Sequence, residues 1–447
     1  MSAATMPHGP KGNFLLGVMA EFNRSPLAFV ERMAREYGDV VRARFFYINS
    51  YFLFHPRDIE QVLVTDSRNF VKPRTLRTPF FCRLVGNGLL TSEGEFWRRQ
   101  RRLAQPAFHR GRINAYGETM VAYAEQMLGH WRAGEERDVH QDMTHLTMQI
   151  VTRTLFNTDV THDAEHINAA LQVIVEPFSS QATLKWILDN RLPTRAHRRF
   201  YEAVRQIDEF VYRIINQRRA SGEDHGDLLS MLLQAEDEED GTRMTDQQLR
   251  DETMTLFLAG YETTSLALSW AWYLLARHPA VEARLWQELD EVLAGRAPQV
   301  SDMPRLRYTE MIAKETMRLY PPAYIIGREA VRECEVGAYR VPAGIQLFIP
   351  AWVVHHDARF FENPEEFRPE RWTPDFIREL PRYAYFPFGG GPRVCIGNSF
   401  AMMEFILLLA TIAQKFRLRL VPEHNVELYP ALSLRPRHGI KVTLERR

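Results

Sequence analysis

A cysteine that follows a glycine-rich loop has the clearest chemical potential in this sequence. Cys395 lies in the stretch Phe388-Gly-Gly-Gly-Pro-Arg-Val-Cys-Ile-Gly397, ahead of an apolar run from Phe400 to Phe416. Glycines let a backbone approach a large planar group closely, and the start of a following helix favours a thiolate. A thiolate suits a soft or redox-active metal such as haem iron. Taken alone, Cys395 could also be a small buried hydrophobe, as isolated cysteines often are.

A single acid lies inside a long apolar segment. Between Thr253 and Ala276 the only formally charged residue is Glu262, and it stands directly before Thr263. The segment is long enough to cross a bilayer, but an acid at mid-membrane is costly. We therefore expect a helix through the middle of a large core, in which Gly260 leaves space for a small ligand. A surface-facing Glu beside ordinary Thr residues is an equally consistent interpretation.

Two further pairs have helical spacing. Glu315 and Arg318 place opposite charges three residues apart on one helix face. Trp97 and Arg101 are four residues apart, and both side chains are donors, which suits a carboxylate acceptor. Either pair could also be an ordinary surface feature, because exposed ion pairs contribute little to stability.

These residues need a largely helical framework to position them. Ser25 and Pro26 predict the start of a first helix, and Gly38 predicts its end. Helical patterns dominate from 94 to 294, another helix follows Cys395, and the stretch 350–392 is predicted to be mostly loop. The predicted strands are 40–46, 51–54, 345–349 and 439–444.

The composition is that of a soluble globular protein. Of the 447 residues, 45% are hydrophobic and 25% are charged, and the formal net charge of zero gives no indication of nucleic-acid binding. Three cysteines exclude a dense disulfide framework and fit a reducing compartment. The apolar stretch 14–22 is too short to span a bilayer. We expect a cytoplasmic protein without a membrane anchor.

The motifs together resemble those of a known family. The segment from Phe388 to Gly397 matches the haem-binding signature of the cytochrome P-450 family. Four more motifs follow the family's order, so the resemblance runs from about Trp97 to the C-terminal segment. They are Trp97-x-x-x-Arg101, Ala259 to Thr264 (with Glu262 where many members have Asp), Glu315-x-x-Arg318, and Phe367 to Trp372.

The resemblance implies a fold and a cofactor. The fold would be mainly α with small β-sheets (α+β), with haem between the long central helix and the helix after the cysteine loop. Residues 1–447 would form a single haem-thiolate monooxygenase domain without a fused reductase. The cofactor would be heme b (iron protoporphyrin IX). Its expected binding residues are Cys395 as axial thiolate ligand, Phe388 in the cysteine loop, and Trp97, Arg101, Arg328 and Arg393, the last four as partners of the propionates.

The resemblance also assigns catalytic and structural roles. Thr263 would support the oxygen chemistry at the haem, and Glu262 would help to relay protons from solvent. Glu315, Arg318 and Arg371 would form a structural triad that locks the cysteine loop. The adjacent histidines His355 and His356 are not expected to bind a metal.

The implied activity is insertion of one oxygen atom, by hydroxylation or epoxidation, into an apolar organic substrate. The reaction would use O2 and two electrons from separate partners, either a ferredoxin with its reductase or a flavodoxin-type donor. Two alternatives are a peroxide-driven peroxygenase and a non-catalytic haem-binding or sensing protein. The acid–threonine pair favours the monooxygenase, because neither alternative needs it.

The substrate is left open by the sequence. Arg74, Arg77 and Arg83 could anchor the carboxylate of a fatty acid, whereas a terpenoid or carotenoid needs no such anchor. Several apolar residues fall where the family's pocket walls lie, although core packing explains any one of them equally well. They are Pro79, Phe80, Phe81, Phe257, Leu258, Tyr261 and Ala323 to Ile326.

Overall fold

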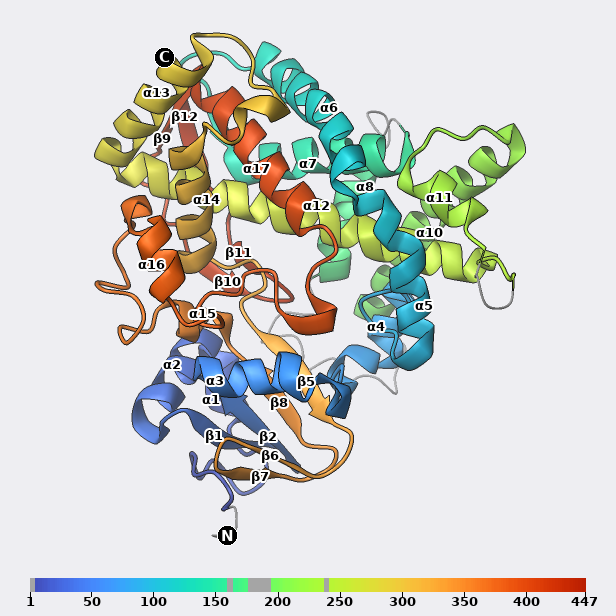
Figure 1. The fold of residues 1–447 in the computed structure, drawn as a ribbon, viewed down its shortest axis with the longest axis vertical. Helices are drawn as coiled ribbons and strands as arrows, with labels where there is room; N and C mark the ends of the chain where they lie inside the picture. The colour runs from blue at the N-terminus through green and yellow to red at the C-terminus, as the bar shows by residue number, and fades with distance from the viewer. Residues whose placement is uncertain (1–4, 159–163, 176–193, 237–240) are drawn as a thin grey trace.

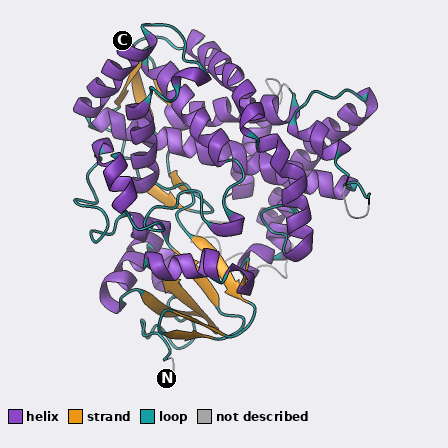
Figure 2. Cartoon of the chain, in the orientation of Figure 1, coloured by secondary structure: helices purple, strands orange, loops and turns teal. Residues whose placement is uncertain are grey.

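The computed structural model describes residues 5–158, 164–175, 194–236 and 241–447. Helices fill most of the molecule, and the largest sheet lies at the end where the N-terminus is found (Figure 2). The predicted mainly α fold with small sheets is confirmed. Within the described ranges, no helix combines the length and the apolarity needed to cross a membrane.

The largest sheet joins strands that are far apart in the chain. β1 (Val40–Phe45) and β2 (Ile48–Leu53) form an antiparallel hairpin, and β2 pairs in parallel with β8 (Gln346–Ile349). β8 pairs with β5 (Ile326–Ala330), which in turn pairs with β3 (Phe70–Val71), both antiparallel. The sheet therefore connects the N-terminal segment to the segment that follows residue 320.

The edge of this sheet brings two cations together. β3 and β5 are in a register that sets Phe70 opposite Ala330 and Val71 opposite Glu329. Lys72 directly follows β3 and so lies next to Arg328 of β5.

Three smaller sheets complete the β-structure. The predicted C-terminal strand is present, shifted by two residues, as the centre of a three-stranded sheet. Its neighbour β9 begins at Phe416, where the helix after Cys395 was expected to end. The remaining strands are β4 (Glu136–Asp138), β12 (Lys441–Arg446) and β9 (Phe416–Leu420) in that sheet, β6 (Cys334–Val336) with β7 (Tyr339–Val341), and β10 (Leu428–Pro430) with β11 (Leu434–Pro436).

The helices surround one long central helix, α12 (Figure 1). In chain order they are α1 (Met19–Arg24), α2 (Pro26–Tyr37), α3 (Pro56–Glu60), α4 (Pro79–Val85), α5 (Gly94–Ala104), α6 (Arg110–Gly129), α7 (Val139–Phe156), α8 (Ala164–Val175), α10 (Arg195–Ser221), α11 (Leu228–Gln234), α12 (Asp246–Arg277), α13 (Pro279–Leu293), α14 (Arg307–Leu319), α15 (Ala351–His355), α16 (Pro374–Glu379) and α17 (Asn398–Ala413).

The central helix is buried on nearly every side, as predicted. It packs against α7, α10, α14 and α17, so apolar residues are needed all round it. It begins earlier than the apolar segment because a capping box closes its first turn. The Thr245 hydroxyl accepts from the Gln248 N–H at 3.2 Å, and the Gln248 side chain accepts from the Thr245 N–H at 2.7 Å.

The stretch 350–392 contains two short helices that the sequence analysis assigned to loop. α16 has a clear start, because the Thr373 hydroxyl accepts from the Phe376 N–H at 3.1 Å and Pro374 occupies the first position. α15 likewise follows a proline, Pro350. In Figure 1, α15 lies below the lower end of α14 and α16 lies to the left of α14.

Candidate functional site

The loop that carries Cys395 is closed by its own backbone. The Cys395 N–H donates to the Phe388 carbonyl at 3.0 Å, and the Val394 N–H donates to the Gly391 carbonyl at 3.1 Å. Phe388 is therefore fixed at the start of the loop and Cys395 at its end. Helix α17 begins three residues after the cysteine.

The glycines of this loop are required by close contacts. Gly391 has a φ of +65°, and a β-carbon there would lie 1.8 Å from the carbonyl oxygen of Leu63. A β-carbon on Gly390 would lie 2.3 Å from the ring of Tyr383. The loop thus packs tightly against the π-helical turn at 61–65 on one side and an aromatic ring on the other. Larger residues would push the cysteine out of place.

The Cys395 side chain is accessible although protein atoms surround it closely. Burial raises the pKa of its thiol, while the Gly397 N–H and the charge of Arg101 act in the opposite direction. The start of the following helix was predicted to favour the thiolate, but burial has the larger effect on the pKa of Cys395. A bound metal ion would reverse this balance, since it deprotonates a coordinating thiol.

A cluster of cations lies near the cysteine loop, at the edge of the five-stranded sheet. Burial and then repulsion by Arg328 and Arg393 lower the pKa of Lys72 to about 7. Burial and then Arg393 likewise lower the pKa of Arg328 to about 10. All three cations are attracted by the same carboxylate, Glu93. Three positive groups therefore share one negative group.

Trp97 and Arg101 lie on α5 beside the same loop. The Arg393 guanidinium lies 4.0 Å from the centroid of the Trp97 ring and pairs with Glu93. Arg101 donates to the Val394 carbonyl at 3.0 Å, and its charge acts on Cys395. The structure thus places Trp97, Arg101 and Arg393 together around the cysteine loop.

These residues fit the expected cofactor. A planar haem carries two carboxylates on one edge, and the surplus of positive charge around Lys72, Arg328 and Arg393 would be neutralised by them. The accessible thiol and the glycine loop suit close approach of a flat group. Lys72 and Glu93 were not identified from the sequence, because neither belongs to a motif. Lys72 reaches the site through the pairing of β3 with β5, and Glu93 through its ion pair with Arg393.

The predicted triad is assembled around Glu315. Its carboxylate accepts from Arg318 at 2.9 and 3.0 Å, from Arg371 at 2.9 Å and from the Trp372 indole at 2.9 Å. The Arg368 N–H adds a further bond at 3.1 Å. The side chains of Glu315 and Arg318 are fully buried, and that of Arg371 is 1% exposed. This is a core ion network and not a surface pair.

His355 connects this network to the cysteine loop. Its carbonyl accepts from Arg318 at 2.9 Å, and its ring Nε2 accepts from the Phe386 N–H at 3.0 Å. Burial, with His356 and Arg318, lowers the pKa of His355 to about 3, so the ring is neutral and can accept this bond. Phe386 stands two residues before Phe388. The network therefore reaches the loop through one hydrogen-bonded side chain.

Glu262 and Thr263 point in different directions from α12. The Thr263 hydroxyl donates to the Ala259 carbonyl at 2.8 Å, and Thr263 and Ala259 are both exposed in the middle of the helix, where their neighbours are mostly buried. The Glu262 carboxylate is buried and pairs with Arg435 at 2.6 Å and with the Ser433 hydroxyl. Thr264, which follows Thr263, lies close enough to Glu404 of α17 to lower the pKa of that carboxyl, against the larger effect of burial.

The three arginines considered as substrate anchors already have partners. Arg74 binds Glu329 at 3.1 Å and the Gly344 carbonyl at 2.6 Å. Arg77 donates to the Lys72 carbonyl at 3.0 Å. Arg83 lies 3.3 Å from Asp208.

The residues expected to line the substrate pocket fall into two groups in the structure, one in the core and one accessible. Phe81, Phe257 and Tyr261 are buried in the main core, where Phe257 packs against Tyr261 with ring centroids 5.4 Å apart. Ala323 is exposed, and Ile325 and Ile326 are half-buried. Core packing therefore accounts for the first three, whereas the segment around Ala323 can contact a ligand.

Comparison with known proteins agrees with this site. Residues 7–444 match the Cytochrome P450 family. Cyclooctatin synthase of Streptomyces melanosporofaciens is 40% identical over 95% of this chain and 92% of its own length. Cyclooctat-9-en-7-ol 5-monooxygenase of the same organism is 38% identical over 91% of this chain and 88% of its own length. Pentalenene oxygenase of Streptomyces avermitilis is 34% identical over 92% of this chain and 91% of its own length.

The fold gives the same result. The crystal structure of the cytochrome P450DA heme domain superimposes with a TM-score of 0.89 at 28% sequence identity, over 99% of this chain and 98% of that chain. Family match, relatives and fold all extend over nearly the whole sequence. The chain therefore belongs to the cytochrome P450 family and is a haem-thiolate monooxygenase.

Proposed function

We propose that this monooxygenase inserts an oxygen atom into a cyclic terpenoid that lacks a carboxylate. The observation that carries the proposal is the engagement of Arg74, Arg77 and Arg83 by protein groups. A fatty-acid substrate would need a cation that is free to pair with its carboxylate. The names of two relatives, cyclooctat-9-en-7-ol 5-monooxygenase and pentalenene oxygenase, support the same substrate class.

In this proposal Cys395 would ligate the haem iron. Lys72, Arg328 and Arg393 would pair with the haem carboxylates, while Trp97 stacks on Arg393 and Arg101 holds the loop at Val394. The haem supplies the activation of O2, and the thiolate promotes it by donating electron density to the metal.

Glu262 and Thr263 move protons in this proposal. Each turnover, written RH + O2 + 2 e⁻ + 2 H⁺ → ROH + H2O, consumes two protons. The Thr263 hydroxyl lies on the exposed face of α12 and can pass a proton through Oγ1, while Glu262 on the next face takes protons up. Restricting delivery to these two groups keeps bulk water away from the reacting centre.

Electrons come from a separate acidic protein, for which a ferredoxin is the best match. Arg98 and Arg102 of α5 are exposed, close in sequence to the Arg101 that holds the cysteine loop. A basic surface there steers an acidic donor toward the shortest route to the cofactor.

The substrate class is tested by a binding titration. Purified haem-loaded protein is titrated with pentalenene, cyclooctat-9-en-7-ol, a long-chain fatty acid and a steroid, and the haem spectral shift is followed. We expect the terpenoids to bind most tightly. Tightest binding of the fatty acid, lost again in an Arg77→Gln variant, would contradict the proposed class.

The proton roles are tested by Thr263→Ala. Without Oγ1 as the last proton donor, we expect electrons to be diverted from product into hydrogen peroxide. Unchanged product per electron in this variant would remove Thr263 from the pathway.

A further inference from the structure

The loop that joins α4 to α5, residues 86–93, is attached to the central helix near its start. The Asn87 N–H donates to Asp251 at 2.8 Å, and the Leu89 N–H donates to Glu252 at 3.0 Å. Two adjacent acids of α12 therefore bind alternate backbone N–H groups of this α4–α5 loop. Neither acid belongs to the cation cluster at the cysteine loop or to the proton roles proposed above.

Two glycines allow the α4–α5 loop to approach α12 closely. Gly86 has a φ of +59°, and a β-carbon there would lie 2.0 Å from the carboxyl carbon of Asp251. A β-carbon on Gly88 would lie 2.7 Å from the Asp251 carbonyl oxygen. One turn further along α12, the Thr255 hydroxyl donates to the Val85 carbonyl at 3.4 Å. The loop therefore lies directly against the helix.

The two acids are held differently. Asp251 also accepts from Arg250 at 3.0 Å and from Gln247 at 2.8 Å. Glu252 is 1% exposed, and its Oε1 has no hydrogen-bond partner among the described residues. Burial, opposed by the Leu89 N–H, raises the pKa of Glu252 to about 8, and the charge of Asp251 adds to the rise. Glu252 is therefore mostly uncharged at neutral pH, and the Leu89 N–H donates to a neutral acid.

The ionisable groups at this end of α12, within the described part of the chain, offer Glu252 no free cation. Asp208 binds both arginines, with Arg250 at 2.7 Å and Arg83 at 3.3 Å. Burial raises the pKa of the thiol and of the phenol, so both stay uncharged at neutral pH. Ionisation of Glu252 would therefore add a second buried negative charge beside Asp251. The groups are Arg83 and Cys82 of α4, Asp208 and Tyr212 of α10, and Arg250 and Asp251 of α12.

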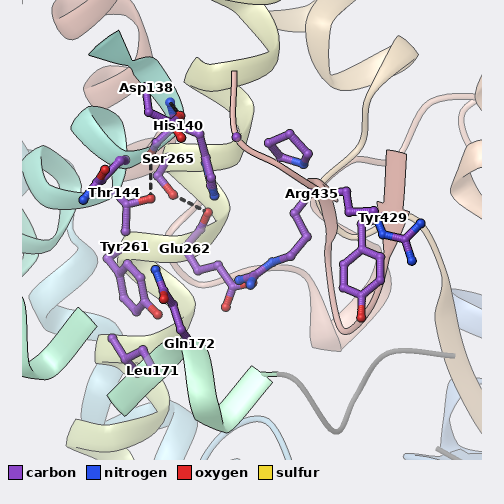
Figure 3. A pocket seen from close by; sticks show the side chains of 14 residues that line it. Asp138, His140, Thr144, Leu171, Gln172, Tyr261, Glu262, Ser265, Tyr429 and Arg435 are labelled. Carbon is purple, nitrogen blue, oxygen red and sulfur yellow. Dashed lines mark hydrogen bonds and ion pairs between the residues drawn. The ribbon is translucent and has the colours of Figure 1, made fainter. Parts of the chain in front are cut away.

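Glu252 lies on the face of α12 that carries Thr263. Successive residues of an α-helix are rotated by about 100°, so positions 252, 259 and 263 lie within about 40° of one another around the axis. Ala259 and Thr263 are exposed, and the proposed function places the substrate beside them. Figure 3 shows Glu262 on another face of α12, directed toward Arg435.

The other end of the α4–α5 loop reaches the cysteine loop. The Ser92 carbonyl accepts from Arg393 at 2.9 Å, and Glu93 pairs with the same guanidinium. Leu89 and Leu90 are half-buried between the two attachments. The loop therefore connects the start of α12 to the cysteine loop, and its two leucines border the space between them.

We propose that Asp251 and Glu252 are positioning residues that hold the α4–α5 loop as one wall of the substrate site, and so determine which carbon of the substrate is oxidised. Leu89 and Leu90 supply the apolar surface of this wall. Ionised Glu252 favours separation of the loop from α12, because a buried charge without a partner is costly and water relieves it. The inference rests on the proposed function for the class of substrate, whereas the attachment of the loop to the helix is independent of that class.

The first test follows hydrogen exchange of residues 86–93 in the holoenzyme by mass spectrometry, with Glu252→Gln as the reference. Glutamine keeps the size and the acceptor of Glu252 but cannot ionise. When the loop opens, the pKa of Glu252 returns from about 8 toward its ordinary 4.5. The exchange rate of wild type relative to Glu252→Gln should therefore rise by up to about tenfold per pH unit between these values and level off above them. A ratio that does not change with pH would overturn the proposal.

The second test removes the acceptor. Glu252→Leu leaves the Leu89 N–H without a partner, so exchange of the loop should be about five- to hundredfold faster than in Glu252→Gln. Asp246→Asn removes an exposed charge from the first turn of the same helix and should exchange as wild type at every pH. Equal exchange in the Leu and Gln variants would overturn the proposal. If Glu252→Leu fails to fold, the pH dependence of the first test decides alone.

The third test measures selectivity at neutral pH, with the compound that gives the largest spectral shift in the binding titration. Relative to Glu252→Gln, we expect Glu252→Leu to show a higher KM and additional regioisomers, while haem content and the reduced carbon monoxide spectrum stay the same. Faster exchange with an unchanged KM and product pattern would show that the loop is no wall of the substrate site. A fatty acid as the best ligand would contradict the proposed substrate class and leave the exchange tests of the loop unaffected.

Discussion

Replacing Glu315 by Gln should destabilise the protein severely. The carboxylate is fully buried and accepts from Arg318, Arg371, the Trp372 indole and the Arg368 N–H. Removing one partner of a buried ion pair costs about 3–5 kcal/mol, because the remaining charge stays buried without compensation. Here two guanidinium groups lose their counter-charge, and the new amide turns a donor toward other donors.

The expected loss is a large part of the total stability. Domains unfold with about 5–15 kcal/mol, so a cost of about 3–5 kcal/mol removes between a fifth and all of that stability. The holoenzyme is unfolded in denaturant and followed by circular dichroism and by the reduced carbon monoxide spectrum. We expect the midpoint to fall and the thiolate-type spectrum to be lost at a lower denaturant concentration than the helical signal.

A matched control lies on the same helix. Glu310 pairs with Lys314 at 2.7 Å at the surface, so Glu310→Gln should cost at most about 1 kcal/mol. If Glu315→Gln unfolds at the same midpoint as Glu310→Gln, the account of Glu315 as the centre of a buried network is refuted.

Three other changes have distinct expected outcomes. Lys72→Met should speed the transfer of haem to apomyoglobin about ten- to hundredfold, as expected for the loss of a charge-assisted contact; an unchanged rate would exclude Lys72 from haem binding. Gly391→Ala should abolish haem incorporation because its β-carbon would lie 1.8 Å from the Leu63 carbonyl oxygen, whereas Gly397→Ala, with 3.7 Å to its nearest atom, should retain it. Burial, opposed by Thr264, raises the pKa of Glu404 to about 8 from its ordinary 4.5. At this site the folded protein then binds more protons than the unfolded chain between these values, so the contribution of Glu404 to the free energy of unfolding should fall as the pH rises from 4.5 to about 8. Over this range the free energy of unfolding of wild type should therefore fall relative to that of Glu404→Gln, and equal changes would mean that Glu404 ionises normally.

The spacing of the motif residues in the sequence correctly predicted which of them are neighbours on a helix. Glu315 and Arg318 lie on one helix face, and the apolar run between Thr253 and Ala276 forms the buried helix that was predicted in preference to a membrane span. Cys395 could be identified because it follows a glycine-rich loop, and the structure shows that close packing requires those glycines. Local patterns were sufficient wherever the interacting groups are close in the chain.

Partners distant in the sequence could not be predicted in this way. Glu262 was recognised, but its direction depends on Arg435, 173 residues further on. Lys72 meets Arg328 only because β3 pairs with β5, and a two-residue strand has no periodicity to detect. His355 was predicted not to bind a metal, and its role was not predicted. In the structure it connects Arg318 to Phe386 through two hydrogen bonds. In each case the missing information is tertiary contact and not residue type.

The central claim is that Cys395 ligates the haem iron. The most direct measurement is the reduced carbon monoxide difference spectrum of Cys395→Ala beside that of wild type, with haem content and circular dichroism measured on the same samples. We predict that wild type shows the absorption band of a thiolate-ligated complex and that the variant, still folded, does not. A thiolate-type band that persists unchanged in Cys395→Ala would contradict the assignment of the ligand.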